Sequence, residues 1–268
     1  SGYLGEERIT QTLRAGLSVA ATYANNPRST SGATWHQIDL TDADRTMELV
    51  TTIRPDVIIN AAYRQSSWAD TADTAVNAAH AAAATRARLV FVSSDVVFDG
   101  HHSPYAEGAA PSPITPYGSA KLAAETAIAT LTPTAVIART SLIVGSDGVS
   151  PQERRVRDLA QRRATGVLFT DDIRCPVHVS DLAAALLELA ATERSGTHHL
   201  AGSDAISRYE MGVLIAQRDG LDASLLQPGT RAGSDSPGPL DVRLDSSATQ
   251  AQLRTRLRGA REFLVKPG

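Results

Sequence analysis

Residues 56–94 read DVIINAAYRQSSWADTADTAVNAAHAAAATRARLVFVSS, and this stretch carries the plainest structural signal in the chain. It begins with a short apolar run at 56–60, continues through an alanine-rich segment to about residue 84, and ends with a second apolar run at 89–92. Short uninterrupted apolar runs are typical of strands buried on both faces, and the alanine-rich segment favours a helix. The stretch therefore predicts two parallel strands joined by a helical crossover.

The same alternation of strands and helices continues on both sides of this unit. We expect further strands over 17–23, 35–40, 134–139 and 197–201, and helices over 4–15, between Asp42 and Pro55, and over 116–131, 150–164 and 181–191. Repeated units of this kind predict an α/β fold with a doubly wound parallel sheet, covered by helices on both faces.

The alternation becomes irregular after residue 145, and residues 227–239 form a loop rich in glycine, proline and serine. We therefore expect two parts in the fold. The main domain comprises 1–145 and 179–202, and a small second lobe comprises 146–178 and 203–268.

The composition excludes several classes of protein. With 268 residues, 42% hydrophobic content and 21% charged content, the chain is typical of a globular protein rather than a disordered one. The net charge of −3 provides no basic field for nucleic acid, and no run of 18 apolar residues predicts a membrane span. A single cysteine, Cys175, excludes an internal disulfide. The N-terminal residues lack a signal-peptide pattern, so we expect a cytoplasmic protein.

The segment Gly2-Tyr3-Leu4-Gly5 leads directly into a predicted helix. Small residues at a helix N-terminus let backbone N–H groups approach a pyrophosphate, although a loop without any ligand can carry the same glycines. The strand and the first glycine that precede such a motif in a dinucleotide-binding loop are absent from the sequence. We expect that the sequence is recorded from partway into the protein.

Two further residues bear on the adenosine end of a dinucleotide. Asp39 lies at the end of the strand predicted over 35–40, where it could bond an adenine amino group or, alternatively, cap the next helix together with Thr41 and Asp42. Residues 23–28 hold no carboxylate for a ribose diol, whereas Arg28 suits a 2′-phosphate. The sequence therefore favours NADP(H), with NAD(H) also compatible.

Tyr117 and Lys121 are four residues apart in the helix predicted over 116–131, so their side chains share one face. An ammonium beside a phenol stabilises the tyrosinate, which makes tyrosine a usable proton donor near neutral pH. Of the 26 basic residues, 24 are arginine and two are lysine, Lys121 and Lys266. The position of Lys121 therefore favours a chemical role over an ordinary exposed pair.

The other candidate residues follow predicted strands, at the sheet edge where ligands bind in α/β proteins. Ser94 follows the strand predicted over 89–92 and could bond a substrate carbonyl opposite Tyr117, although a Ser-Ser-Asp run also suits a turn. Small residues after Asn60 would let a ribose approach the backbone. Asn77 could fix backbone or water near the lysine, or lie on a plain helix surface.

Other polar residues carry weaker signals. The histidine pairs at 101–102 and 198–199 lack a third ligand at suitable spacing, so we expect no metal site. The arginines between 154 and 163 could hold a diphosphate or form a solvated helix face. Arg174 could face a substrate phosphate or lie on the surface, and we expect His178 to be structural and Cys175 to be a packing residue.

Taken in order, these motifs resemble the extended short-chain dehydrogenases/reductases, and within them the dTDP-4-dehydrorhamnose reductase group. The motifs are Gly2-Tyr3-Leu4-Gly5, Asp39-Leu40, Asn60-Ala61-Ala62, Ser94 to Gly100, Tyr117-Gly118-Ser119-Ala120-Lys121 and Arg139-Thr140-Ser141. The resemblance implies a Rossmann fold, a nicotinamide cofactor and a nucleotide-sugar pocket in the second lobe. It assigns Ser94 as the catalytic hydroxyl, Tyr117 as the acid and Lys121 as the cation that anchors the cofactor.

The resulting cofactor-binding candidates are Gly2, Tyr3, Leu4, Gly5, Arg28, Asp39, Leu40, Asn60, Ala61, Ala62, Tyr63, Asn77, Tyr117 and Lys121. The substrate-binding candidates are Asp95, Val97, Arg139 and Arg174. After Arg139-Thr140, the segment Ser141-Leu142-Ile143 lacks the aromatic residue that this group often has, so stacking on a deoxysugar is not expected.

The sequence thus favours an NAD(P)H-dependent reductase of a 4-keto sugar nucleotide. The resemblance is also compatible with a homodimer. The same group includes the regulatory β subunit of methionine adenosyltransferase, so a non-catalytic binding protein on this fold is an alternative. A nucleotide-sugar epimerase or dehydratase is another alternative. The pair of Tyr117 and Lys121 is common to all three and does not choose among them.

Overall fold

The computed structural model describes residues 2–26, 30–145, 148–235 and 238–265. The chain forms two compact units, each assembled from three separate segments. Unit 1 comprises Ser1–Ser94, Pro116–Arg139 and Ala183–His198, and unit 2 comprises Asp95–Thr115, Thr140–Leu182 and His199–Gly268.

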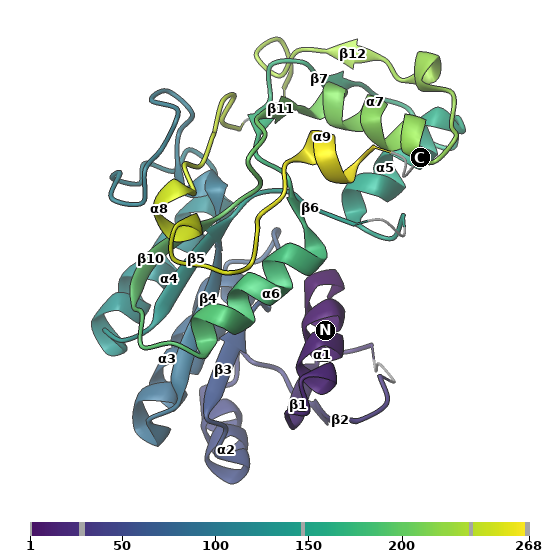
Figure 1. Cartoon of the computed structure of the whole chain (residues 1–268). Coiled ribbons are helices and arrows are strands. Elements are labelled where there is room, and N and C mark those ends of the chain that lie inside the picture. Colours follow the sequence, from purple (N-terminus) through teal and green to yellow (C-terminus); the bar gives the residue numbers. More distant parts are fainter. Residues whose placement is uncertain (1, 27–29, 146–147, 236–237, 266–268) are drawn as a thin grey trace. The chain divides into compact units, whose positions relative to one another are not determined.

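Unit 1 is built on two sets of strands, and Figure 1 shows them in the lower part of the view. β3 (Val57–Asn60), β4 (Arg88–Ser94), β5 (Val136–Thr140) and β10 (Gly196–Leu200) form one sheet in the order β10-β5-β4-β3. β3 and β4 pair in parallel, as residues 56–94 predict. β1 (Val19–Tyr23) and β2 (Ala33–Gln37) form a separate parallel pair. The predicted α/β class is confirmed.

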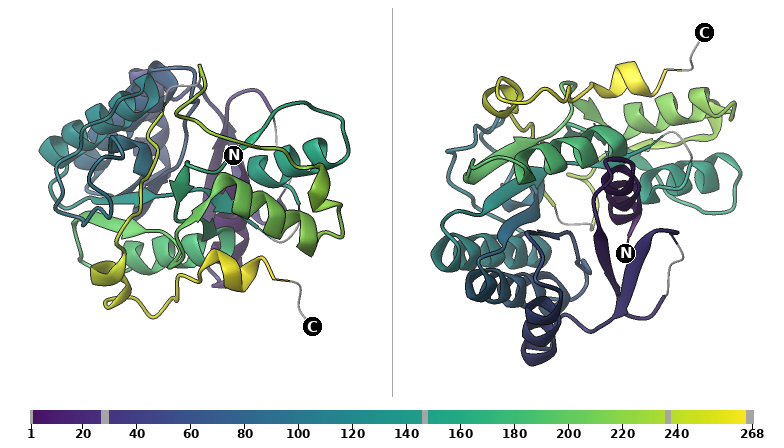
Figure 2. Two further views of the ribbon diagram at one scale, coloured as in Figure 1. Left: turned by 90° about the horizontal axis from the view of Figure 1, so that it is seen from above. Right: turned by 60° about the horizontal axis from the view of Figure 1, so that its bottom comes forward.

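Helices cover both faces of the four-stranded sheet. In Figure 1, α3 (Thr74–Thr85) and α4 (Pro116–Leu131) lie behind it and α6 (Val179–Ala190) lies in front, and the views in Figure 2 agree. Alanines let α3 approach the sheet closely, because Ala75, Ala79 and Ala82 are fully buried in one cluster with Leu89 and Phe91. A π-helical turn over Ala69–Asp73 precedes α3, and no sequence signal indicated it.

The N-terminal helices follow their predicted bounds closely. α1 spans Tyr3–Arg14 and ends before Gly16, whose φ of +76° favours glycine. α2 spans Ala43–Ile53, and its N-cap Asp42 accepts a hydrogen bond from the Arg45 backbone N–H. The strand predicted over 35–40 lies earlier, at Ala33–Gln37, because the chain turns at Asp39.

Unit 2 contains short strands and helices. Its helices are α5 (Pro151–Ala160), α7 (Arg208–Arg218), α8 (Ser247–Gln250) and α9 (Ala260–Phe263), with 3-10 turns at Asp95–Val97 and Ala223–Leu225. Its two-residue strands are β6 (Ile143–Val144), β7 (Leu168–Phe169), β8 (Ile173–Arg174), β9 (Val177–His178), β11 (Ile206–Ser207) and β12 (Pro228–Gly229), which pair as β6 with β9, β8 with β11 and β7 with β12. The helix predicted over 150–164 ends at Ala160.

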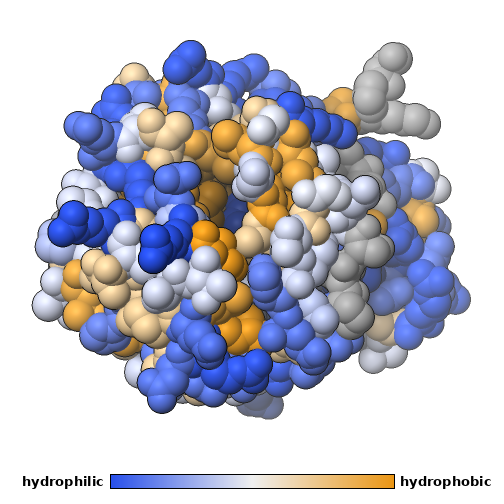
Figure 3. Space-filling view, turned by 90° about the horizontal axis from the view of Figure 1, so that it is seen from below, coloured by the Kyte–Doolittle hydropathy of each residue, from blue (hydrophilic) through white to orange (hydrophobic). Residues whose placement is uncertain are grey.

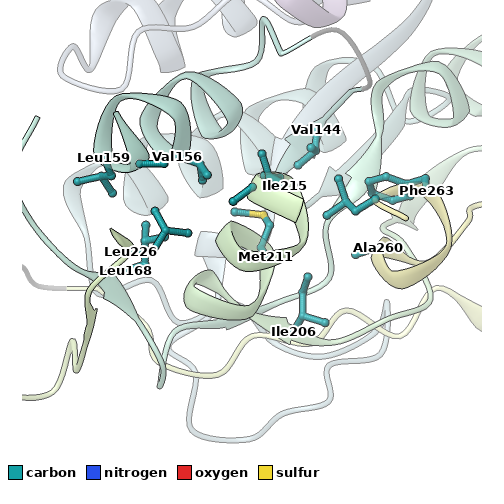
Figure 4. Packing of buried hydrophobic residues seen from close by; sticks show 13 residues of the cluster. Val144, Val156, Leu159, Leu168, Ile206, Met211, Ile215, Leu226, Ala260 and Phe263 are labelled. Carbon is teal, nitrogen blue, oxygen red and sulfur yellow. The ribbon is translucent and has the colours of Figure 1, made fainter. Parts of the chain in front are cut away.

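One apolar cluster holds unit 2 together. Figure 4 shows Met211 and Ile215 of α7 between Val156 of α5 on one side and Phe263 of α9 on the other. Met211 and Ile215 are 2% and 0% exposed, so this cluster is a core of its own. Each such side chain contributes about 1.5–3 kcal/mol through its burial. Unit 2 therefore has its own hydrophobic core.

The division differs from the predicted one most at residues 95–115, and also at 140–145, 179–182 and 199–202, all of which belong to unit 2. The Tyr105 backbone N–H donates to the Arg243 carbonyl at 2.8 Å, and the Asp245 N–H donates to the Tyr105 carbonyl at 2.8 Å. Gly100 has a φ of +86°, and a Cβ there would lie 2.9 Å from the Leu240 nitrogen. These pairings between residues about 140 positions apart leave no periodic signal in the sequence.

No helix among the described residues is both long enough and apolar enough to cross a membrane. The face drawn in Figure 3 is hydrophilic over most of its area, with apolar residues gathered toward the middle. The large apolar side chains that are more than two-fifths exposed are Leu17, Tyr63, Trp68, Ile114, Val149, Val167 and Val265.

Candidate active site

The predicted pair on α4 forms, and its lysine is buried. The Lys121 side chain is 2% exposed, and Nζ donates a hydrogen bond to the Val92 carbonyl of β4 at 2.8 Å. Nζ also lies over three aromatic rings, at 4.7 Å from the centroid of Phe91, 5.1 Å from Tyr63 and 5.9 Å from Tyr117. The alternative of an ordinary exposed pair is therefore wrong for Lys121.

Burial changes the acid–base behaviour of this lysine. Desolvation lowers the pKa of Lys121 to about 7, and the nearby Glu125 carboxylate opposes that shift. An amine with a pKa of about 7 is only partly protonated near neutral pH. The charge on Lys121 therefore depends on its immediate neighbours.

A Lys121→Met substitution is expected to raise the melting temperature at pH 7 by several degrees, because about 1 kcal/mol corresponds to 2–4 °C for a chain of this size. Burial lowers the pKa of Lys121, so the unfolded chain binds this proton more tightly than the folded chain. The stability of the wild-type protein therefore rises between about pH 7 and pH 10. The advantage of the variant should shrink over that interval, as thermal unfolding at pH 7 and 9.5 would show. An equal advantage at both pH values would contradict this account.

The end of β4 presents two serines on opposite faces of the strand. Ser94 is the last residue of β4 and is half-buried, at the edge predicted for ligands. Ser93 is 2% exposed, and its hydroxyl donates to Oε1 of Glu125. Neither Ser93 nor Glu125 is among the site residues that the sequence predicts. The position of Glu125, four residues after Lys121 on one helix, was the available signal.

Arg139, a substrate-binding candidate, lies inside unit 1. Its guanidinium is 5% exposed and forms a two-pronged pair with Glu125, with Nη2 2.7 Å from Oε2 and Nε 3.1 Å from Oε1. Arg139 is thus paired with a protein carboxylate and does not lie on the surface.

The segment after β3 lies beside the pair. Tyr63 is 56% exposed, and its ring centroid is 5.7 Å from that of Tyr117 at an interplanar angle of 37°. Asn60 is buried, and its Nδ2 donates to the Thr74 carbonyl at 3.2 Å, while its buried Oδ1 has no partner among the described residues. An unsatisfied buried acceptor at a sheet edge is where a ligand or water is expected. Ala61 and Ala62, beside it, are half-buried and small.

A cavity of about 400 Å³ lies at the ends of β1 and β2. Asp39 lines it, and the carboxylate also accepts hydrogen bonds from the Thr41 N–H at 3.0 Å and the Thr41 hydroxyl at 2.7 Å. These bonds lower the pKa of Asp39 and keep it charged. Asp39 thus closes a turn ahead of α2, whose N-cap is Asp42, and its contact with adenine stays a prediction. The remaining lining residues are Ala24, Asn25, Gln37, Ile38, Arg45, Arg64 and Asp70.

The predicted phosphate loop is the N-terminus of α1. Gly2 is the N-cap with extended backbone, and no side chain caps the helix there. Tyr3, Leu4 and Gly5 form the first turn, and Leu4 is 7% exposed, so its side chain packs inside. The backbone N–H groups of this turn are thus the groups that could meet an anion.

Two other cofactor-binding candidates have different outcomes. Asn77 donates from Nδ2 to the carbonyls of Leu40 at 2.9 Å and Thr41 at 3.1 Å, so it fixes backbone beside Asp39. The plain helix-surface interpretation of Asn77 is therefore wrong. Arg28, predicted to favour a 2′-phosphate, lies outside the described residues.

In unit 2, the substrate-binding candidates are buried. Asp95 accepts from the Ser141 hydroxyl at 2.7 Å, and Arg174 Nε lies 3.6 Å from its carboxylate. Arg174 is 2% exposed and donates to the carbonyls of Pro239 and Leu240, so the surface interpretation of Arg174 is wrong. The Val97 side chain is fully buried. A second cavity, of about 280 Å³, is lined by Asp99, Gly100, His101, Ile114, Arg231, Ala232, Ser234, Gly238 and Leu240.

The weaker signals of the sequence also have structural explanations. On α5, Arg155 donates to the Thr165 carbonyl at 3.0 Å and Arg157 to that of Gly148 at 3.0 Å, which supports a solvated face bound to neighbouring loops. Cys175 is buried, and burial raises its pKa to about 11, so it is a packing residue as predicted. His178 packs its ring on Phe263 at 5.2 Å, in agreement with a structural role.

Comparison with known proteins gives a consistent result. The RmlD substrate binding domain family model matches residues 1–266. The chain is 31% identical to a probable low-salt glycan biosynthesis reductase of Haloferax volcanii, over 94% of this chain and 90% of that protein. It is 30% identical to a dTDP-4-dehydrorhamnose reductase of Aggregatibacter actinomycetemcomitans, over 75% and 74%. It is also 30% identical to methionine adenosyltransferase 2 subunit beta of Rattus norvegicus, over 80% and 70%.

Two solved structures are similar across nearly the whole chain. One is a hypothetical dTDP-4-dehydrorhamnose reductase from Sulfolobus tokodaii, with a TM-score of 0.80, 29% identity, and coverage of 96% of this chain and 93% of that one. The other is a dTDP-4-dehydrorhamnose reductase from Bacillus anthracis in complex with NADP, with a TM-score of 0.79, 23% identity, and coverage of 92% and 96%. The second supports the fold.

Proposed function

The chain belongs to the RmlD substrate binding domain family, and from this premise we propose that it is an NAD(P)H-dependent reductase of a 4-keto sugar nucleotide. The observation that carries the proposal is the buried ammonium of Lys121 beside the Tyr117 ring, at the sheet edge where Ser94 ends β4. A tyrosine supported by a buried cation suits the donation of a proton to a carbonyl oxygen. Two relatives, at 31% and 30% identity, are named as reductases, which agrees with this chemistry.

The residues of unit 1 fit a dinucleotide. We propose that the N–H groups of the first turn of α1 bind the pyrophosphate, and that Asp39 meets the adenine in the cavity beside β2. Asn60 supports the same fit, because its buried Oδ1 lacks a partner among the described residues. When bound, the reduced nicotinamide would supply a hydride to the substrate carbon. NADP(H) is the preferred form in this proposal, and NAD(H) is also accommodated.

The chain's own residues handle the proton. The Tyr117 hydroxyl donates its proton to the carbonyl oxygen of the substrate and becomes tyrosinate. The Lys121 ammonium stabilises that tyrosinate electrostatically, which lowers the barrier to the transfer. The Ser94 hydroxyl donates a hydrogen bond to the same oxygen and orients the carbonyl. We propose no metal in this reaction.

The test is a reduction assay at 340 nm with NADPH and dTDP-4-dehydrorhamnose, repeated with NADH and with 4-keto sugar nucleotides that carry other bases. We expect substrate-dependent oxidation of NADPH at a rate on the order of 1–1000 per second, in the ordinary range for enzymes. Binding of NADPH is followed separately by nicotinamide fluorescence. Binding without turnover of any of these compounds would contradict the reductase and favour a regulatory protein. Tightly retained NAD with isomerised product would favour an epimerase. The cytoplasmic location and the homodimer stay predictions.

A further inference from the structure

A carboxylate lies one helical turn beyond Lys121, in the interior of unit 1. We propose that Glu125, clamped by Ser93 and Arg139, is the buried counter-ion that keeps the Lys121 ammonium charged and held beside the Tyr117 ring. Glu125 thus acts through Lys121 as a positioning residue. The role of Glu125 in catalysis rests on the proposed reductase function, whereas its effect on the charge of Lys121 does not.

The clamp fixes the position of the carboxylate. Arg139 binds both oxygens of Glu125, at 2.7 Å and 3.1 Å, and the Ser93 hydroxyl donates to Oε1. Glu125 and Arg139 are each 4% exposed, and Ser93 is 2% exposed. Paired donors on both oxygens restrict the rotation of the carboxylate. Glu125 is therefore held in one orientation inside the protein.

The other neighbours of Lys121 supply little negative charge. Lys121 faces the Tyr117 ring from α4, the Phe91 ring and the Val92 carbonyl from β4, and the Tyr63 ring from the segment after β3. Glu125, also on α4, interacts with it electrostatically. Of these groups, Glu125 is the anion, and the same carboxylate pairs with Arg139 from β5. Helical i,i+4 spacing places Glu125 on the same face as Lys121, and charges interact strongly away from water.

The Glu125 carboxylate is shared by two cations, the Lys121 ammonium and the Arg139 guanidinium. Removing Glu125 and removing Arg139 should therefore have opposite effects on the pKa of Lys121. Glu125→Gln would leave the ammonium and the Arg139 guanidinium without their shared carboxylate, and the amine would lose its proton more readily. Arg139→Gln would keep a donor beside Glu125 and remove the competing cation, and the ammonium would be held more firmly. Damage to the packing alone would not produce shifts of opposite sign.

The test uses the fact that the chain contains two lysines, Lys121 and Lys266. In protein labelled with ¹³C-lysine, two Cε signals are followed against pH by NMR, and Lys266→Arg identifies the signal of Lys121. We expect a midpoint near 7 for Lys121 in the wild-type chain. The midpoint should fall by about one pH unit or more in Glu125→Gln, rise in Arg139→Gln and stay near 7 in Glu125→Asp.

The control is Glu48→Gln, which removes a carboxylate from the exposed side of α2 and should leave the midpoint unchanged. If Glu125→Gln fails to fold, the rise in Arg139→Gln and the retained midpoint in Glu125→Asp still test the proposal. An unchanged midpoint in Glu125→Gln and Arg139→Gln, or shifts of the same sign in both, would overturn it.

Turnover separates this inference from the proposed function. In an active enzyme, Glu125→Gln should lower kcat about tenfold or more with KM changed little, because the proton step alone is affected. Shifted midpoints in a chain that reduces no 4-keto sugar nucleotide would uphold the counter-ion and defeat the reductase. Normal turnover with unshifted midpoints would uphold the reductase and defeat the counter-ion proposal.

Discussion

Replacing Tyr117 by phenylalanine should lower the rate of carbonyl reduction by a factor of about 100 to 10,000, the usual contribution of a general acid. The substitution removes one hydroxyl and keeps the ring that lies 5.9 Å from Lys121 Nζ and 5.7 Å from the Tyr63 ring. The packing of unit 1 and the cavity that Asp39 lines should therefore be preserved. Binding of NADPH should change by less than about threefold, since the loss falls on the transition state.

The measurement pairs the reduction assay with a fluorescence titration of NADPH, and Tyr63→Phe is the matched comparison. Tyr63 also carries a hydroxyl, and its ring centroid lies 5.1 Å from Lys121 Nζ, but desolvation raises its pKa. A raised pKa makes a phenol a poorer proton donor near neutral pH, so the Tyr63→Phe variant should lose less than about tenfold in rate. A large loss in Tyr63→Phe together with nearly full activity in Tyr117→Phe would reassign the acid.

The sequence could predict the elements whose signal is local. The apolar runs at 56–60 and 89–92 predicted β3 and β4, and α4 has the predicted bounds, Pro116–Leu131. Helical spacing then placed Tyr117 and Lys121 on one face. These inferences depend on periods of two and 3.6 residues, which the sequence displays directly.

The partners of these residues could not be predicted in the same way. Whether Lys121 is buried depends on which rings cover it, and Glu125 on α4 pairs with Arg139 on β5, 14 residues later. Arg174 in unit 2 is a second example. Because Arg174 lies in an irregular segment, the sequence suggested a surface position or a ligand site. In the structure it donates to the carbonyls of Pro239 and Leu240, 65 and 66 residues away. Pairing over such distances is decided by packing and not by local pattern.

The charge balance around Arg174 leads to the largest expected effect on stability. Asp172 is fully buried, and three arginines converge on it: Arg174 at 2.8 Å, Arg208 at 3.2 Å and Arg231 at 2.6 Å. Asp95 is a second, more distant anion, 3.6 Å from Arg174. Desolvation also lowers the pKa of Arg208, although the Asp172 carboxylate opposes that shift. The single carboxylate of Asp172 thus offsets much of the charge of three guanidinium groups.

Asp172→Asn should therefore destabilise unit 2 by about 3–5 kcal/mol, because it keeps the shape of the side chain and leaves three arginines with little opposing charge. Urea unfolding followed by circular dichroism measures the loss. The matched control is Asp158→Asn, which removes the carboxylate of an exposed pair with Arg163, where the two side chains are 45% and 58% exposed. Such a pair contributes about 1 kcal/mol or less. Equal losses in the two variants would show that burial does not set the strength of the cluster, since both substitutions remove the same charge and differ in their access to water.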